Sequence, residues 1–146
     1  MAYKMGQVEE IGLGGISLRF LEDGTANGAG LTMFEMTVAA GAGMPVPHYH
    51  EAFDETVYGV SGRLRFTIDG EAREAGPGEH AFIGRGRVHA FTNPFEEPAK
   101  VLCVITPGVL GAEYFREIRG LIAGGGPPDP NAIGAVMMKH GLVPVR

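Results

Sequence analysis

The sequence predicts an all-β protein built as an antiparallel sandwich or barrel. Three observations lead to this fold class. Apolar runs of strand length recur at short intervals, turn-forming residues separate them, and no helical pattern is interleaved among them. Glycine supplies 24 of the 146 residues, roughly twice the usual share, which suits short strands joined by tight turns.

Seven strands are expected in the first three quarters of the chain. They are ISLRFL (16–21), LTMFEMTVA (31–39), ETVYGV (55–60), RLRFTI (63–68), EHAFI (79–83), VHAFTN (88–93) and KVLCVIT (100–106). The turn signals between them are DGTANGAG, GAGMPVP, VSG, DG, GPG and GRG.

After Pro107 the apolar pattern becomes helical. The helical spacing in GAEYFREIRGLIA involves Tyr114, Phe115, Ile118, Leu121 and Ile122. A second helix is expected in DPNAIGAVMMKHG, where Asp129 is the N-cap and Pro130 takes the first helical position. We therefore expect a barrel domain over residues 1–110 and a helical extension over 111–146 that packs on it.

Charge and composition exclude several classes of function. The net charge of −5 and the pI near 5.5 argue against a surface for nucleic acid or for an anionic membrane. There is no apolar run of 18 residues, and MAYKMGQVEE at the N-terminus has no hydrophobic region or cleavage-like site. The expected location is the cytoplasm. The single cysteine, Cys103, excludes an internal disulfide, and we interpret it as a small buried strand residue.

The segment PHYHEAFDETVYGVSG (47–62) contains a candidate metal site. His48 and His50 are two residues apart, so on a strand both imidazoles project from one face. Neutral imidazole is a common ligand of late first-row metals, and Glu51, Asp54 and Glu55 are nearby carboxylates. His89 leads back into the sheet after a glycine-bracketed turn. Buried structural histidines would give the same pair, so the HxH pattern alone leaves both interpretations open.

The spacing of these residues resembles the cupin superfamily, in particular its small single-domain members of the cupin_2 type. The first family motif, G-x5-HxH-x3,4-E-x6-G, matches residues 41–62 through His48, His50, Glu55 and Gly62. The second, G-x5-P-x-G-x2-H-x3-N, matches residues 78–93. Two positions depart from the motifs: Ala42 stands where the first motif has its leading glycine, and Gly84 replaces the proline of the second.

The resemblance implies a double-stranded β-helix, or jelly-roll, barrel with two short C-terminal helices. It also implies four metal ligands, namely His48, His50, Glu55 and His89. By their chemistry these ligands suit one divalent transition metal ion, and Fe, Mn, Ni, Co, Cu and Zn all fit. In six-coordinate geometry two positions stay open for substrate or dioxygen. Glu51 and Asp54 are then expected to be solvated loop acids.

Strand alternation predicts further pocket residues. Val57 and Gly59 share the face of Glu55, and Phe91 shares the face of His89, so all three are expected to line a substrate pocket. Arg65 has two interpretations. The alternation of RLRFTI places it in solvent, whereas a resemblance to oxalate-degrading cupins implies an inward arginine that anchors a carboxylate or an enolate.

The leading functional hypothesis is a metal-dependent oxidoreductase of the quercetinase-like dioxygenase type. It would act on a small organic substrate that chelates the metal, with Glu55 as ligand and proton acceptor. One alternative is a non-redox isomerase, lyase or polyketide-type cyclase, and another is a non-catalytic cupin that binds a small ligand or a metal. The resemblance also implies a homodimer, and a small-molecule substrate is the other expected partner.

Overall fold

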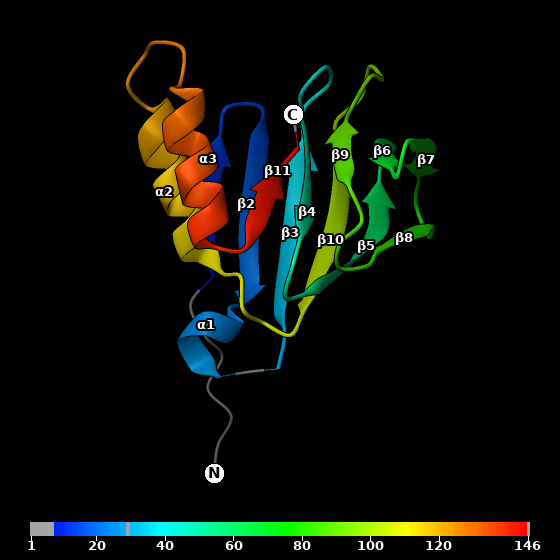
Figure 1. The fold of residues 1–146 in the computed structure, drawn as a ribbon. Coiled ribbons are helices and arrows are strands. Elements are labelled where there is room, and N and C mark those ends of the chain that lie inside the picture. Colours follow the sequence, from blue (N-terminus) through cyan, green and yellow to red (C-terminus); the bar gives the residue numbers. More distant parts are fainter. Residues whose placement is uncertain (1–7, 29, 146) are drawn as a thin grey trace.

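The computed structural model describes residues 8–28 and 30–145. Residues 1–7, in which the sequence predicts no targeting signal, lie outside the described residues, as do residues 29 and 146. Two antiparallel sheets face each other, and a pair of helices lies along one flank (Figure 1). The predicted all-β jelly-roll class with two C-terminal helices is confirmed.

The larger sheet has six strands and the smaller sheet has five. The larger sheet has the order β1 (Glu9–Leu13), β2 (Ile16–Glu22), β3 (Thr32–Val38), β10 (Ala99–Thr106), β5 (Asp54–Ser61) and β8 (His80–Ile83). The smaller sheet has the order β11 (Leu142–Pro144), β4 (Gly43–His50), β9 (His89–Thr92), β6 (Leu64–Ile68) and β7 (Glu71–Ala75).

The core lies between the sheets because the apolar residues of each strand alternate with polar ones. Strand β3 is buried at every second residue from Thr32 to Val38, and β10 shows the same alternation. Val101, Cys103 and Ile105 of β10 are at most 1% exposed and face the interior. The prediction that Cys103 is a buried strand residue is thus confirmed.

Several elements were missing from the sequence interpretation. Strands β1, β7 and β11 were not expected, and most of β4 was taken for a turn because it contains Pro45 and Pro47. The pairing of β4 with β9 is irregular between Met44 and His48, where prolines, which lack an amide hydrogen, are tolerated. The glycine-rich segment after β2 contains a four-residue helix, α1 (Gly24–Asn27), which the side chain of Asp23 caps through the Thr25 amide.

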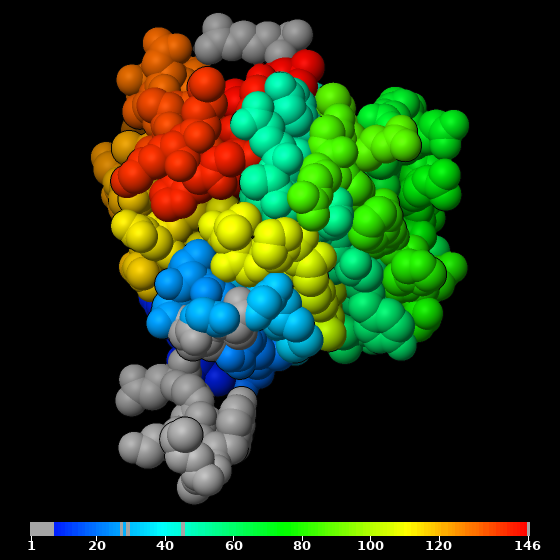
Figure 2. Space-filling view, turned by 60° about the horizontal axis from the view of Figure 1, so that its bottom comes forward, coloured from blue at the N-terminus to red at the C-terminus, as the bar shows by residue number. Residues whose placement is uncertain are grey.

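The two predicted helices are α2 (Ala112–Ile122) and α3 (Pro130–Lys139). The side chain of Asp129 accepts a hydrogen bond from the Asn131 amide, as expected for an N-cap. Lys139 of α3 binds Glu117 of α2 at 2.7 Å. Figure 2 shows this C-terminal segment, in orange and red, on one flank of the molecule and the green strands on the opposite flank. In the described part of the chain, no helix has the length and apolar character needed to cross a membrane.

Two glycines explain how the motif turns form. Gly62 has φ +67°, and a Cβ built there would lie 2.2 Å from the carbonyl oxygen of Pro98, so only glycine fits. Ala42, at the first departure from the motif, is accommodated because Gly41 provides the left-handed conformation with φ +78°.

Candidate metal centre

The smaller sheet brings three histidines together. His48 and His50 lie on β4 and His89 on β9, and His48 is paired directly with His89 across these two strands. The side chains are 6%, 2% and 4% exposed, and each offers a ligand nitrogen within 4.8 Å of the other two. These three residues, called the histidine cluster below, could hold a metal ion, as in cupins.

Backbone carbonyls orient two of the three imidazoles. Nδ1 of His48 lies 3.1 Å from the carbonyl oxygen of Val46, and Nδ1 of His89 lies 3.0 Å from that of Arg87. With the ring proton donated there, Nε2 of each histidine keeps a free lone pair for a cation. The metal-ligating histidines of proteins are commonly fixed in this way.

His50 is held by packing instead. Its ring stacks on Phe53 with centroids 4.2 Å apart, and its Nε2 lies 4.0 Å from Oε1 of Glu55. Nδ1 of His50 is buried without a hydrogen-bond partner among the described residues. A buried polar atom without a partner is uncommon in a structural core, so this ring is easier to explain as a ligand than as a satisfied core histidine.

Burial keeps the cluster neutral. Desolvation lowers the pKa of His48, and desolvation together with the other two histidines lowers the pKa of His50 to about 2. Desolvation, followed by the effect of His48, lowers the pKa of His89 to about 4. All three imidazoles are therefore unprotonated at neutral pH, which is the form that binds a metal. The donor set fits a divalent transition metal ion.

Glu55 approaches the cluster from the opposite sheet. It lies on β5, its side chain is 16% exposed, and burial raises its pKa to about 7. Cys103 on the neighbouring strand β10 offsets part of this rise, and burial, followed by the charge of Glu55, raises the pKa of the Cys103 thiol well above its usual value. Glu55 stands beside the histidine cluster and is not one of the three residues with mutually close ligand atoms.

Hydrogen bonds to residues of β4, β5 and the turn after β6 hold the turn before β9 in place. This turn leads directly into His89, so these contacts help to position its side chain. The Gly86 amide donates to the carbonyl oxygen of His50 at 2.8 Å. Asp54 accepts hydrogen bonds from the amide and guanidinium of Arg85. Asp69 accepts from the Val88 amide at 3.1 Å and from the side chain of Arg87.

The interpretation of Asp54 as a solvated loop acid is therefore wrong. Asp54 is the first residue of β5, and the Arg85 side chain and amide lower the pKa of its carboxyl group. Its local sequence gives no sign of this role, since Arg85 is 31 residues away. Glu51 is exposed in the bend after β4, as expected.

A cavity of about 70 Å³ opens beside the histidine cluster between the two sheets. Its polar lining groups are the three histidines, Glu55 and Tyr114, and no lysine or arginine is among the described residues that form its wall. The rest of the wall is apolar, and part of it comes from the C-terminal segment, through Tyr114, Phe115, Met137 and Leu142. The sequence did not predict these four as cavity residues. Their helical spacing or apolar character indicates only that they are buried, and does not show which cavity they face.

The predicted pocket residues have different positions. Phe91 lines the cavity, as expected. Val57 is fully buried in the core, and Gly59 packs so closely on the backbone of Gly76 that a Cβ there would lie 2.0 Å from the Gly76 oxygen. Both face the interior, but neither is among the residues that line the cavity.

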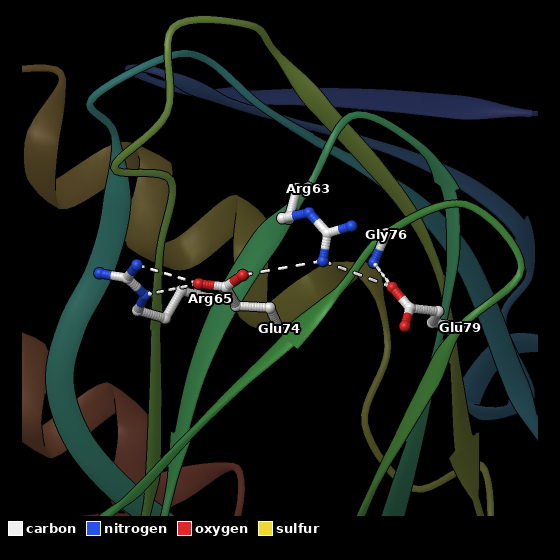
Figure 3. A network of polar contacts seen from close by, with 5 residues as sticks. All are labelled: Arg63, Arg65, Glu74, Gly76 and Glu79. Carbon is white, nitrogen blue, oxygen red and sulfur yellow. Dashed lines mark hydrogen bonds and ion pairs between the residues drawn. The ribbon is translucent and has the colours of Figure 1, made fainter.

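Arg65 lies on the outer side of β6. Its guanidinium binds Glu74 at 3.0 Å and lies 5.5 Å above the ring of Phe95. Figure 3 shows that this pair continues through Arg63 to Glu79, along the outside of the sheet. Of the two interpretations of Arg65, the structure supports the outward one, because alternation along β6 turns Leu64 and Phe66 inward.

Comparison with known proteins agrees with this fold. Residues 34–105 match a family model described as "Cupin domain". An uncharacterized protein of Aquifex aeolicus (strain VF5) is 32% identical over 71 residues, which make up 49% of this chain and 58% of that protein. The match therefore leaves a large part of the Aquifex protein without a counterpart.

Two solved structures illustrate the structural likeness. KdgF from Halomonas sp. superposes with a TM-score of 0.60 at 22% identity, over 68% of this chain and 86% of that chain. A sugar phosphate isomerase from a cupin superfamily, from Silicibacter pomeroyi, superposes with a TM-score of 0.54 at 30% identity, over 63% of this chain and 59% of that chain. At 22% sequence identity, the structural likeness to KdgF shows that the two proteins share a fold and nothing more.

Proposed function

The chain belongs to the cupin superfamily, and from this premise we propose that it is a metal-dependent oxidoreductase of the dioxygenase type. The proposed substrate is a small, largely apolar organic molecule with an enol, phenol or neighbouring hydroxyl and carbonyl groups. The observation that carries the proposal is the combination of three neutral, buried imidazoles with a cavity whose wall is otherwise almost entirely apolar.

The protein's own residues have separable roles in this proposal. His48, His50 and His89 would hold the metal ion, and Glu55 is the fourth candidate ligand. When bound, a divalent transition metal supplies Lewis acidity and, for a redox-active ion, a means of reacting an organic molecule with dioxygen. Glu55 would accept the proton of the substrate hydroxyl, because its pKa of about 7 suits proton transfer near neutral pH.

The apolar wall supports an apolar substrate. Met44, Phe66 and Phe91 of the smaller sheet face the cavity together with side chains from the helices. Such a wall admits dioxygen and an organic molecule while it excludes water from the reacting atoms. A sugar phosphate would need cationic or hydrogen-bonding partners for its phosphate, and no lysine or arginine of the described chain lines this cavity.

A second candidate is a non-redox isomerase or lyase. It is favoured by Glu55, whose raised pKa suits a group that takes a proton from one carbon and returns it to another. The 30% identity to the sugar phosphate isomerase from Silicibacter pomeroyi also favours this class of reaction, although the apolar wall argues against the same substrate.

The test begins with protein purified without an affinity-column metal and then loaded with Fe²⁺, Mn²⁺, Cu²⁺, Ni²⁺, Co²⁺ or Zn²⁺. Each form is incubated with β-diketones, catechols and α-hydroxy ketones, with dioxygen and without it, while oxygen uptake and product formation are followed. We expect turnover to consume dioxygen and to need a redox-active metal.

Equal turnover without dioxygen, and with Zn²⁺, would instead identify the isomerase or lyase. Tight metal binding with no turnover of any compound would leave a binding protein. The His89→Ala variant is the negative control for every reaction, and His80→Ala, which removes an exposed histidine of β8, is the matched positive control.

A further inference from the structure

Tyr114 contributes a hydroxyl group to the wall of the cavity beside the histidine cluster. It belongs to the first turn of α2, and its side chain is 3% exposed. Apart from the three histidines and Glu55, it is the only described residue of that wall with an oxygen or nitrogen atom in its side chain. Packing alone does not explain a phenol in apolar surroundings, because the ring of phenylalanine would fill almost the same space.

The ring of Tyr114 is held by aromatic contacts from both C-terminal helices. It lies edge to face with Phe115, at 4.8 Å between centroids, and with the imidazole of His140, at 5.4 Å. Nε2 of His140 in turn lies 3.3 Å from Oε2 of Glu117, which joins the end of α3 to α2. The protein therefore sets the position of the ring before any ligand binds.

The same segment connects this ring to the strand that carries two of the histidines. Gly141 follows His140 directly, and its carbonyl oxygen accepts a hydrogen bond from the Glu51 amide. Leu142, the next residue, is opposite His50 in the pairing of β11 with β4. Tyr114 and the histidine cluster therefore border one cavity, from the helices and from the smaller sheet.

The hydroxyl of Tyr114 makes no hydrogen bond within the described part of the chain. Burial raises the pKa of Tyr114 to about 13, so the phenol keeps its proton and can donate it to a hydrogen bond. Among the described side chains, Nδ1 of His50 is the one nitrogen or oxygen that is both fully buried and without a partner. The hydroxyl therefore borders open space, and the open space that Tyr114 lines is the cavity.

We propose that Tyr114 is a specificity-determining residue, whose hydroxyl donates a hydrogen bond to a substrate oxygen that does not bind the metal. The proposal rests on the proposed function, in that it places the chelating end of the substrate at the histidine cluster. It narrows the substrate class to compounds with a third oxygen, as an ether, hydroxyl or carbonyl, joined to the chelating pair by a short apolar part.

This hydrogen bond would select between compounds of the same shape. A substrate oxygen that accepts from Tyr114 gives a desolvated donor its partner, whereas a hydrocarbon analogue leaves that donor unpaired. The phenol is uncharged, so it favours a neutral acceptor. This agrees with a wall in which no described lysine or arginine is available to bind an anionic group.

The test measures the binding of two pairs of β-diketones to the full chain loaded with Zn²⁺, without dioxygen. (Methoxyacetyl)acetone is compared with butyrylacetone. (Methoxypropionyl)acetone, with its methoxy group on the terminal carbon, is compared with valerylacetone. Within each pair an ether oxygen replaces one methylene group, and its distance from the chelating carbonyls differs between the pairs. We expect Tyr114→Phe to raise the dissociation constant of at least one ether about fivefold and to leave that of its hydrocarbon partner unchanged.

A second measurement needs no ligand. Because the hydroxyl has no partner within the described protein, Tyr114→Phe should not lower the melting temperature of the metal-free chain. Tyr58→Phe is the matched control, since it removes the hydroxyl of a tyrosine of β5 that is 47% exposed. It should change neither the melting temperature nor the affinity for either ether.

The outcomes distinguish the role of Tyr114 from the function on which it rests. If no diketone binds, or if His89→Ala binds them as well as the unchanged protein, the proposed metal-centred function is wrong and the role of Tyr114 falls with it. If the diketones bind through the histidines but Tyr114→Phe affects ether and hydrocarbon equally in both pairs, only the role of Tyr114 is wrong. A lower melting temperature of Tyr114→Phe would also overturn that role, since the hydroxyl would then be bonded within the protein.

Discussion

His48 and His89 face each other directly across β4 and β9, with ring centroids 4.4 Å apart. The two residues are 41 positions apart in the sequence, but the pairing of β4 with β9 places them side by side. Their Nδ1 atoms each lie near a carbonyl oxygen two residues earlier in the chain, that of Val46 on β4 and that of Arg87 in the turn before β9. The two rings therefore have the same local support and present the same nitrogen to the space between them.

The first prediction concerns metal binding by this pair. His89→Ala should lower the bound transition metal, measured by elemental analysis of protein purified without an affinity-column metal, to less than about a tenth of a full equivalent. Added metal should raise the melting temperature of the unchanged protein but not that of the variant. His80→Ala, on the exposed face of β8, should behave like the unchanged protein. Equal metal content in both variants would remove the basis for the site.

The second prediction concerns the pH dependence of the metal-free protein. Glu55 has its pKa raised to about 7 from an ordinary 4.5, so its contribution to stability is present below pH 4.5 and lost as the pH rises through 7. His50 and His89 act in the opposite direction. Their lowered pKa values, about 2 and about 4, make a contribution that is present above pH 6.5 and lost as the pH falls.

The Glu55→Gln variant separates these effects. Relative to the unchanged protein, its free energy of unfolding should increase between pH 5 and pH 8, by about 2 kcal/mol. Urea unfolding at pH 5, 6.5 and 8 measures this difference, and Glu51→Gln, in the exposed bend after β4, is the control. A difference that is the same at every pH would mean that Glu55 is ionised throughout.

The third prediction tests the turn that positions His89. Asp54→Ala removes the acceptor of the Arg85 amide and guanidinium. We expect its dissociation constant for Co²⁺ to rise about tenfold, because changes in the residues that hold metal ligands in place commonly weaken metal binding by about 10–100-fold. The free energy of unfolding should also fall, because the variant loses these hydrogen bonds. Glu51→Ala removes a nearby acid without these contacts and should change neither quantity. Titration calorimetry of both variants makes the comparison, and equal affinities would show that the turn does not depend on Asp54.

The fourth prediction compares two adjacent methionines of α3. Met137 is 5% exposed and lines the cavity, whereas Met138 is 63% exposed. Met137→Ala should lower the free energy of unfolding by about 2–4 kcal/mol and enlarge the cavity. Met138→Ala should change it by less than about 0.5 kcal/mol. Denaturant unfolding gives both values, and equal losses would mean that α3 presents a different face to the barrel.

Local pattern explains what could be predicted from the sequence. The shared face of His48 and His50 follows from two-residue alternation, and the positions of Glu55 and His89 follow from motif spacing that reflects fixed strand and turn lengths. The outward position of Arg65 was also available from the alternation of β6. The two C-terminal helices were predictable because Asp129, Pro130 and the apolar spacing are all local signals.

Contacts between distant segments were not predictable in this way. The nearness of Cys103 to Glu55 on the inner face of the larger sheet depends on the register of two strands that are far apart in the chain. The contact of Asp54 with Arg85 and the place of Tyr114 and Met137 in the cavity wall have the same origin. Strand β11 is too short and too ordinary in composition to be recognised without its partner, β4.

The pairing of β11 with β4 also bears on the order in which the molecule assembles. Leu142 is opposite His50 and Pro144 is opposite His48. The two paired segments are more than ninety residues apart in the sequence, and the intervening chain must fold before β11 can cover the outer edge of β4. Contacts of such long sequence separation form slowly. During refolding, the recovery of metal affinity should therefore lag behind the recovery of the far-ultraviolet circular dichroism signal of the β-sheets. The delay between the two signals would give the rate at which β11 pairs with β4.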